Sequence, residues 1–362
     1  MKNRVVGLDV LRAVAILLVM WSHSLVFLKE SKWYSVFSFK PFDGVDLFFV
    51  LSGFLIGGLM LRELESNPSL NWSAYWIFLR RRWLRTLPAY YVTLLLLAML
   101  GFIWPAFQSD HVNWWSYVFF YQNLFQPLVG FFWESWSLAV EEWFYFLWPL
   151  AICILTPWIT GKRAYLWSTS LMLLAAIIGR HLAFNPALDD FWMDVRIRKM
   201  VILRWDSIAI GLFLVYWMRT HRIIRFKRSL FGIGLTIIMA LSALDLSNQS
   251  YFKQVPYFTI VSMSMALLIP WVCDWNITQN RFVAFLTFTS RISYSLYLVN
   301  LTLVCGFIAI MSESFSACRG VNAFFVFWIM SYLLAYAMHR WIEKPFLVWR
   351  DKYIGAEKVK ST

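Results

Sequence analysis

Residues 8–24 of the chain read LDVLRAVAILLVMWSHS, an apolar run interrupted by Asp9, Arg12 and His23. If this run is an α-helix, the step from Arg12 to His23 makes about three turns, so both side chains lie on one face, about 16 Å apart. Ionisable side chains in an apolar helix are costly and usually face the interior of a membrane bundle or a water-filled cavity. The stretch therefore predicts a membrane-spanning first helix with a polar stripe that faces other helices.

The rest of the chain has the same apolar character. It is 60% hydrophobic with a mean hydropathy of +0.60, well above the content of an ordinary soluble domain. Runs near the ~20 residues that span a bilayer recur throughout it. The sequence predicts an all-α membrane protein, a bundle of about ten transmembrane helices that form one domain over residues 1–346, with a short charged tail over residues 347–362. The predicted helices cover residues 9–28, 44–61, 83–104, 135–157, 163–180, 201–218, 229–245, 256–273, 292–311 and 321–342.

The distribution of basic residues predicts an orientation. Most of the 33 lysines and arginines lie on the side of this bundle that holds both termini. Because basic residues gather on the cytoplasmic side of membrane proteins, we expect cytoplasmic termini and a cytoplasmic tail in a bacterial inner membrane, with His23 toward the outer face. The net charge of +13 then indicates contact with anionic membrane lipids or an anionic co-substrate, and no nucleic acid. The cysteines and histidines show no spacing typical of a metal site, so none is expected.

A long aromatic connection is predicted at the outer face. Residues 105–134 contain no lysine or arginine and include Trp114, Trp115 and Trp133. Aromatic residues gather at membrane–water interfaces, so an aromatic belt is one interpretation. The other is a surface on which sugar rings stack.

The predicted spans contain further ionisable residues whose roles the sequence leaves open. A structural interpretation pairs them off, Asp9 with Arg12, and Arg204 or Arg85 with a glutamate. A functional interpretation places them in a polar cavity. His23 has no obvious local partner and is a candidate for chemistry. The other ionisable residues of the spans are Asp46, Glu141, Glu142 and Asp206.

Two patterns at the second and third predicted helices each have a structural and a functional interpretation. Ser52, Gly53, Gly57 and Gly58 form a small-residue face, which either lets two helices approach closely or lets a slender ligand pass. In the run FLRRRWLR, residues 78–85, Arg82 and Arg85 are three apart and share a face. They anchor the cytoplasmic side of the helix, or they form a guanidinium clamp for phosphate.

Taken together, these blocks resemble the acyltransferase-3 family. The resemblance rests on the Arg12-x10-His23 pair and on motifs that follow in family order from residue 7 to residue 346. It implies an integral membrane enzyme that moves acetyl or related acyl groups from cytoplasmic acyl-CoA to extracytoplasmic glycans, lipid-linked glycans or other hydroxylated acceptors. The motifs are DGVDLFFVLSGFLI (43–56), RRRWLRTLPAYY (80–91), ESWSLAVEEWFYFLWP (134–149), LRWDSIAIGLFL (203–214), SYSLYLVN (293–300) and WIEKPF (341–346).

The resemblance also implies roles for single residues. The family's histidine corresponds to His23 and its arginine partner to Arg12, while its arginine motif corresponds to Arg82 and Arg85. Its W-S-L-x-x-E element corresponds to Trp136, Ser137 and Glu141. The chain departs from the family twice. Trp143 stands where the family often has glutamine, and Asn300 stands where it commonly has histidine, so the role of that histidine is lost or is taken over by an amide.

The implied layout gives a chemical hypothesis. The nucleotide of acetyl-CoA, the expected co-substrate, would bind near Arg82 and Arg85, and its pantetheine arm would extend past Arg12 toward His23. His23 would act as general base on the acceptor hydroxyl, with Glu141 orienting it. A covalent acyl-histidine is the competing mechanism. No tightly bound cofactor is expected. Two other classes of function remain, a secondary transporter and a polysaccharide polymerase or flippase without acyl chemistry.

Overall fold

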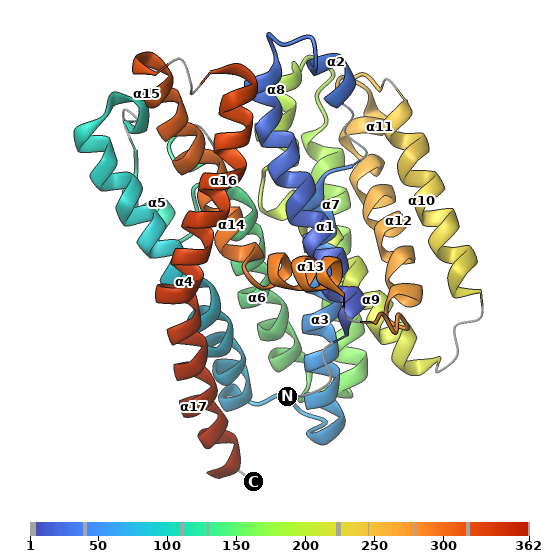
Figure 1. Cartoon of the computed structure of the whole chain (residues 1–362). Coiled ribbons are helices and arrows are strands. Elements are labelled where there is room, and N and C mark those ends of the chain that lie inside the picture. Colours follow the sequence, from blue (N-terminus) through green and yellow to red (C-terminus); the bar gives the residue numbers. More distant parts are fainter. Residues whose placement is uncertain are drawn as a thin grey trace.

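The computed structural model describes residues 5–38, 42–108, 112–128, 130–221, 226–244, 246–278, 280–315 and 319–360. Among these residues there are helices and connections but no strands. Most of the long helices run side by side along one direction (Figure 1). This arrangement agrees with the predicted all-α bundle.

Each of the ten predicted stretches coincides with a helix. Two of them are broken by a π-helical turn, at residues 300–305 and 339–343. The long helices are α1 (Val6–Ser24), α3 (Gly44–Ser66), α4 (Trp72–Ile103), α6 (Ser135–Leu155), α7 (Gly161–Ala183), α9 (Trp205–Thr220), α10 (Lys227–Ala243), α12 (Pro256–Val272), α14 (Ser293–Val299) with α15 (Gly306–Ser314), and α16 (Gly320–Met338) with α17 (Lys344–Lys360).

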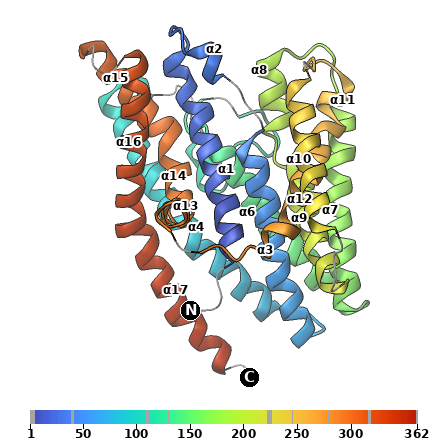
Figure 2. The ribbon, with the colours of Figure 1, turned by 45° about the vertical axis from the view of Figure 1, so that its right-hand side comes forward.

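Shorter helices occur between the long helices along the chain. Most of them cap the end of the bundle at which α2 and α11 lie, whereas α13 lies across the long helices, as Figures 1 and 2 both show. The short helices are α2 (Tyr34–Phe37), α5 (Trp114–Val118), α8 (Asp190–Met193), α11 (Tyr251–Gln254) and α13 (Arg281–Arg291).

Fewer than ten of the described helices qualify as membrane spans by length and composition alone. Among the described residues, seven helices are long and apolar enough to cross a membrane. An eighth span results if the helical segments Asp190–Arg198 and Ile202–Thr220, which meet at an angle of 87°, count as one. The first helix begins and the last helix ends toward the same end of the molecule (Figure 1). The count of ten and the cytoplasmic side of the termini remain predictions.

The structure moves two predicted boundaries. Helix α4 begins at Trp72 and not at residue 83, because the side chain of Asn71 accepts a hydrogen bond from the backbone N–H of Ala74 (2.8 Å) and caps the helix. Arg80, Arg81 and Arg82 therefore lie within the helix. At the other end of the chain, residues 347–360 of the predicted tail are part of helix α17.

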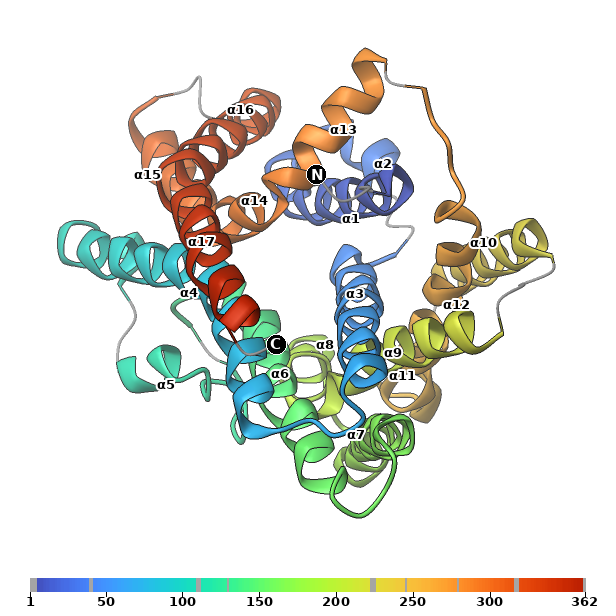
Figure 3. The same cartoon turned by 90° about the horizontal axis from the view of Figure 1, so that it is seen from below.

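The small-residue face of α3 serves helix packing. Seen from below, α3 lies inside the bundle, with α1, α9, α7 and α12 around it (Figure 3). A Cβ atom on Gly53 would lie 2.0 Å from the carbonyl oxygen of Ile208 in α9, and one on Gly211 would lie 2.1 Å from that of Val50. The two backbones are therefore in direct contact. The close-approach interpretation is confirmed for Gly53, whereas Ser52 hydrogen-bonds Tyr145 (2.5 Å) at a cavity.

We expect Gly53→Ala to destabilise the bundle by about 1–3 kcal/mol, because the added methyl group must push α9 away. Gly58→Ala is the matched control, since its Cβ would meet Val215 at an ordinary 3.5 Å. Thermal unfolding of the detergent-solubilised variants measures the difference. Equal melting temperatures for the two variants would contradict this account of the α3–α9 contact.

Candidate active site

His23 lies in the last turn of α1, where its imidazole meets the side chain of Asn300. The distance from His23 Nδ1 to Asn300 Oδ1 is 2.5 Å. The amide nitrogen of Asn300 donates to the carbonyl oxygens of Leu296 (2.8 Å) and Tyr297 (2.9 Å), so the oxygen is the atom that faces His23. An oxygen can only accept, so Nδ1 of His23 carries the hydrogen. In the neutral ring, Nε2 then holds the free lone pair.

Asn300 owes its position to a local irregularity of the helix. It opens the π-helical turn of residues 300–305, which follows α14. Such wide turns are rare in proteins as a whole, but those that occur are often found at functional sites. The sequence marked Asn300 as the place where an amide replaces a histidine of the family. The structure shows this amide against His23.

Glu141 does not contact His23. Among the described residues, the hydrogen-bond partner of His23 is Asn300. Glu141 lies in a neighbouring cavity with Arg82 and Arg85. The predicted contact in which Glu141 orients His23 is therefore wrong, because the carboxylate of Glu141 lies in the cavity of Arg82 and Arg85. A catalytic role for Glu141 itself remains a prediction.

A different carboxylate, which was not predicted, lines the same cavity as His23. Glu134 precedes α6 and accepts hydrogen bonds from the backbone N–H (3.1 Å) and from the hydroxyl of Thr302. Burial raises the pKa of Glu134 to about 7. Its place at the start of the ESWSL motif was the only sequence signal for it.

His23 and Glu134 line one cavity of about 450 Å³, which we call the histidine cavity. It lies between the end of α1, the start of α3, the start of α6, the bend at residues 198–199 and the α10–α12 pair. Of the aromatic connection, Trp133 reaches it, whereas Trp114 and Trp115 are not among its lining residues. The chemically relevant lining residues are His23, Asp43, Trp133, Glu134, Trp136, Arg198, Lys199, Lys253, Tyr257 and Tyr297.

Two further cavities lie between the histidine cavity and the α17 end of the bundle, and both are lined by the predicted arginine clamp. The junction cavity, about 110 Å³, is lined by Arg12, Arg82, Arg85, Glu141 and Tyr145 among others, and it shares Val45 and Tyr297 with the histidine cavity. The arginine cavity, about 520 Å³, shares Arg82 and Arg85 with the junction cavity. Because neighbouring cavities share walls, the three form a series from the α17 end of the bundle to His23.

The three arginines that the sequence marked for the donor meet in the junction cavity. Arg12 binds Asp9 (3.1 Å), as the pairing hypothesis predicts, and also the hydroxyl of Ser290 (3.2 Å). The guanidinium of Arg82 lies 5.4 Å from the ring centroid of Tyr145. Arg12 is therefore both an ion-pair partner and a wall of the cavity.

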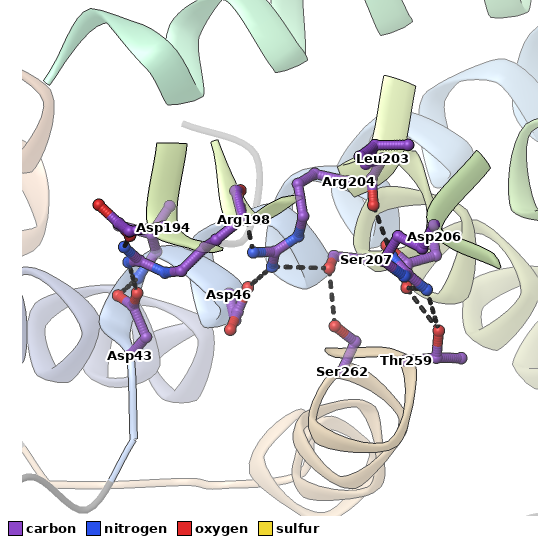
Figure 4. Close-up of polar contacts among 12 residues, drawn as sticks. Asp43, Asp46, Asp194, Arg198, Leu203, Arg204, Asp206, Ser207, Thr259 and Ser262 are labelled. Carbon is purple, nitrogen blue, oxygen red and sulfur yellow. Dashed lines mark hydrogen bonds and ion pairs between the residues drawn. The ribbon is translucent and has the colours of Figure 1, made fainter. Parts of the chain in front are cut away.

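Ion pairs hold the bent segment, residues 190–204, against the start of α3, and the pair of Arg204 with Asp46 is buried (Figure 4). Arg198 binds Asp43 and Asp194, and Arg204 binds Asp46. The predicted pairing of Arg204 with a glutamate is wrong, since its partner is an aspartate of α3. Burial alone would raise the pKa of Asp43, but Arg198 and the backbone N–H of Val45 outweigh it, so the pKa lies below its ordinary value.

The ion pairs continue away from the cavity. Arg180 of α7 binds Asp206 (2.8 Å), and Thr259 of α12 donates to the same carboxylate (2.6 Å). Removing one partner of such a buried pair leaves an uncompensated charge. Because Arg180 also donates to the carbonyl oxygen of Leu203, these residues hold the end of the bent segment and the start of α9 against α7 and α12.

These features define a multi-pass membrane protein with a buried histidine at the end of a series of polar cavities. The family described as an acyltransferase domain matches residues 5–349. The chain belongs to this family, the acyltransferase-3 family, as the motifs predict.

Two relatives carry names that bear on function. The "Putative O-acetyltransferase SAR0937" of Staphylococcus aureus is 25% identical over 96% of this chain. The peptidoglycan O-acetyltransferase OatA of Listeria monocytogenes is 32% identical over 54% of it. The chain spans 59% of the length of the first relative and 29% of the second. No solved structure matches the chain.

Proposed function

We propose that the chain is a membrane O-acetyltransferase of the bacterial inner membrane. It takes an acetyl group from cytoplasmic acetyl-CoA and transfers it to a hydroxyl of a glycan or lipid-linked glycan at the outer face. The observation that carries this proposal is the series of cavities that runs from Arg82 and Arg85 to the lone pair of His23 Nε2. Family membership and the names of the relatives support the choice of an acetyl group and a hydroxyl acceptor.

The donor half of the mechanism follows from charge and shape. The phosphates of coenzyme A are anionic, and guanidinium groups bind phosphate through two parallel hydrogen bonds. Arg82 and Arg85 stand where the arginine cavity meets the junction cavity. The nucleotide binds there, and the neutral pantetheine arm passes through the junction cavity beside Arg12.

The acceptor half uses His23. Its Nε2 takes the proton of the acceptor hydroxyl as the oxygen attacks the thioester carbonyl. The C–S bond breaks, the ester forms, and the imidazolium returns the proton to the thiolate of coenzyme A. Asn300 accepts from Nδ1–H throughout and keeps Nε2 directed to the substrate.

Release of the free CoA thiol tests the proposal. The purified chain in lipid nanodiscs, given acetyl-CoA and cell-surface glycans, should release thiol in an acceptor-dependent manner and yield glycans heavier by one acetyl group. A secondary transporter or a polymerase or flippase consumes no thioester. Absence of acceptor-dependent thiol release across lipid-linked and polymeric glycans would therefore favour those classes.

We expect Arg82→Ala and Arg85→Ala each to raise the KM for acetyl-CoA by about 10-fold or more, because each loses a charge-assisted contact of about 1.5–3 kcal/mol with phosphate. Arg80→Ala is the control, since Arg80 is exposed and is not among the lining residues of the arginine cavity. Initial rates over a range of acetyl-CoA concentrations measure the effect. An unchanged KM in both variants would identify these arginines as membrane anchors.

A further inference from the structure

Cationic side chains gather on the wall of the histidine cavity. Arg198 and Lys199 come from the bend that precedes α9, and Lys253 comes from α11. All three lie beside aromatic rings, with Lys199 over Trp133 at 4.9 Å and Arg198 over Trp136 at 5.3 Å. The mechanism of acetyl transfer uses none of these charges.

Two of the three cations are neutralised within the protein. Arg198 binds Asp43 and also Asp194 (2.6 Å), and Lys199 binds the second oxygen of Asp194 (2.5 Å). These two cations therefore share two carboxylates.

Lys253 is different. Among the described residues, no carboxylate lies within ion-pair distance of its ammonium group. Its Nζ lies 3.5 Å from the ring centroid of Tyr257, and this contact orients the ammonium without using up its hydrogen-bond donors. Burial, and the charge of Arg198, lower the pKa of Lys253 below its ordinary value, as expected for a cation without an anionic partner.

The acidic residues of the cavity do not supply this partner. Asp43 is bound to Arg198. Glu134 is bound to Thr302, and burial raises its pKa to about 7, so part of it is uncharged at neutral pH. The cavity therefore carries an excess of positive charge next to His23.

We propose that the acceptor is an anionic sugar, whose carboxylate or phosphate binds Lys253 and thereby places a neighbouring hydroxyl at Nε2 of His23. The inference rests on the proposed function and narrows its acceptor. Lys199 lies on the same wall and adds to the attraction, while Trp133, Trp136 and Tyr257 offer flat faces to the sugar ring. A neutral sugar would leave the half-buried ammonium of Lys253 without a charged partner.

Binding of a matched pair of sugars tests the inference without relying on turnover. The full chain is placed in phosphatidylcholine nanodiscs, and binding of methyl glucuronide, methyl glucoside and glucose 6-phosphate is measured by saturation-transfer NMR. The glucuronide and the glucoside differ in one carboxylate. We expect both charged sugars to bind about 10-fold or more tightly than the glucoside, equivalent to about 1.4 kcal/mol.

Variants assign the preference to a residue. Lys253→Gln should bring the charged sugars to within about twofold of the glucoside, and Lys253→Arg should retain the preference. Lys32→Gln is the matched control, because Lys32 also lies over an aromatic ring, Trp33, at 5.5 Å, but is not among the residues that line the histidine cavity. Lys32→Gln should bind like the wild type.

The outcomes separate this inference from the proposed function. Equal binding of charged and neutral sugars by the wild type, including no detectable binding of any, would overturn the inference. A preference that survives in Lys253→Gln would also overturn it. If a polyprenyl diphosphate in the nanodisc binds in a Lys253-dependent manner and the charged sugars do not, the anion belongs to a lipid carrier and the sugar assignment is wrong. Binding of charged sugars without acceptor-dependent thiol release would support the anionic-sugar site and contradict the proposed acetyltransferase activity.

Discussion

His23→Ala is expected to abolish acetyl transfer while the protein remains folded and membrane-inserted. A positioned general base contributes about 10²- to 10⁴-fold to a rate, so kcat should fall by at least that factor. The variant removes the imidazole that lines the histidine cavity and contacts Asn300. Its KM for acetyl-CoA should change little, because the proposed binding site for the donor phosphates is at Arg82 and Arg85. Acceptor-dependent thiol release measures both quantities.

His181→Ala is the matched control for this experiment. His181 is exposed, hydrogen-bonds Tyr251 (3.1 Å) and is not among the residues that line the histidine cavity. It should turn over acetyl-CoA like the wild type. Near-normal turnover of His23→Ala would refute the assignment of His23 as base or nucleophile, and a loss of turnover in both variants would point to a general effect on folding.

The pH dependence needs a second variant, because two groups of the histidine cavity titrate. A neutral histidine base predicts that the rate falls as the pH drops through the pKa of His23. Glu134 also gains a proton as the pH falls. Burial raises its pKa to about 7, so its titration also contributes to the pH profile. Glu134→Gln removes this second titration and keeps an oxygen that can accept from Thr302. The acid limb that remains in this variant belongs to His23.

The positions of the helices could be predicted because apolar runs report directly on membrane helices. The same signal could not give the bend of 87° between residues 190–198 and 202–220. The charges of Arg196, Arg198 and Lys199 made this segment look like a loop. In the structure, Asp43 just before α3, Asp46 within α3 and Asp194 of the segment itself bind the arginines of the bend.

The site could be predicted in part, and the missing part is contact between distant segments. Sequence spacing placed Arg12 and Asp9 together because they are three residues apart on one helix. It could not show that Asn300, 277 residues away in sequence, meets His23, or that Arg204 meets Asp46 across 158 residues. Within one helix the rise and turn fix which side chains meet, whereas between helices the packing decides.

The lining of the histidine cavity illustrates the same limit. Trp133, Lys199 and Lys253 come from three segments, each of which reads as an ordinary interfacial loop in sequence. Only the packing of the α10–α12 pair and the bend against the start of α6 brings them around His23. The positive charge of the histidine cavity is therefore a property of the fold.

Asn300→Leu is expected to lower kcat by about 10- to 100-fold and to leave the KM for acetyl-CoA unchanged. Leucine has the same number of side-chain heavy atoms and the same branching as asparagine, but it accepts no hydrogen bond. His23 Nδ1–H would lose its acceptor, which costs about 1–3 kcal/mol for a buried donor. The tautomer that has the hydrogen on Nδ1 and the lone pair on Nε2 would then no longer be favoured. Initial rates at saturating acceptor separate kcat from KM.

Asn300→His distinguishes a positioning role from a general need for a polar side chain at this place. The family resemblance implies a histidine at this position, and its neutral ring has one nitrogen that can accept from Nδ1–H of His23. We expect this variant to keep most of the activity that Asn300→Leu loses. Wild-type kcat in Asn300→Leu would show that the acceptor for Nδ1–H is dispensable. Equal losses in both variants would mean that the packing of the π-helical turn, and not the hydrogen bond, sets the position of His23.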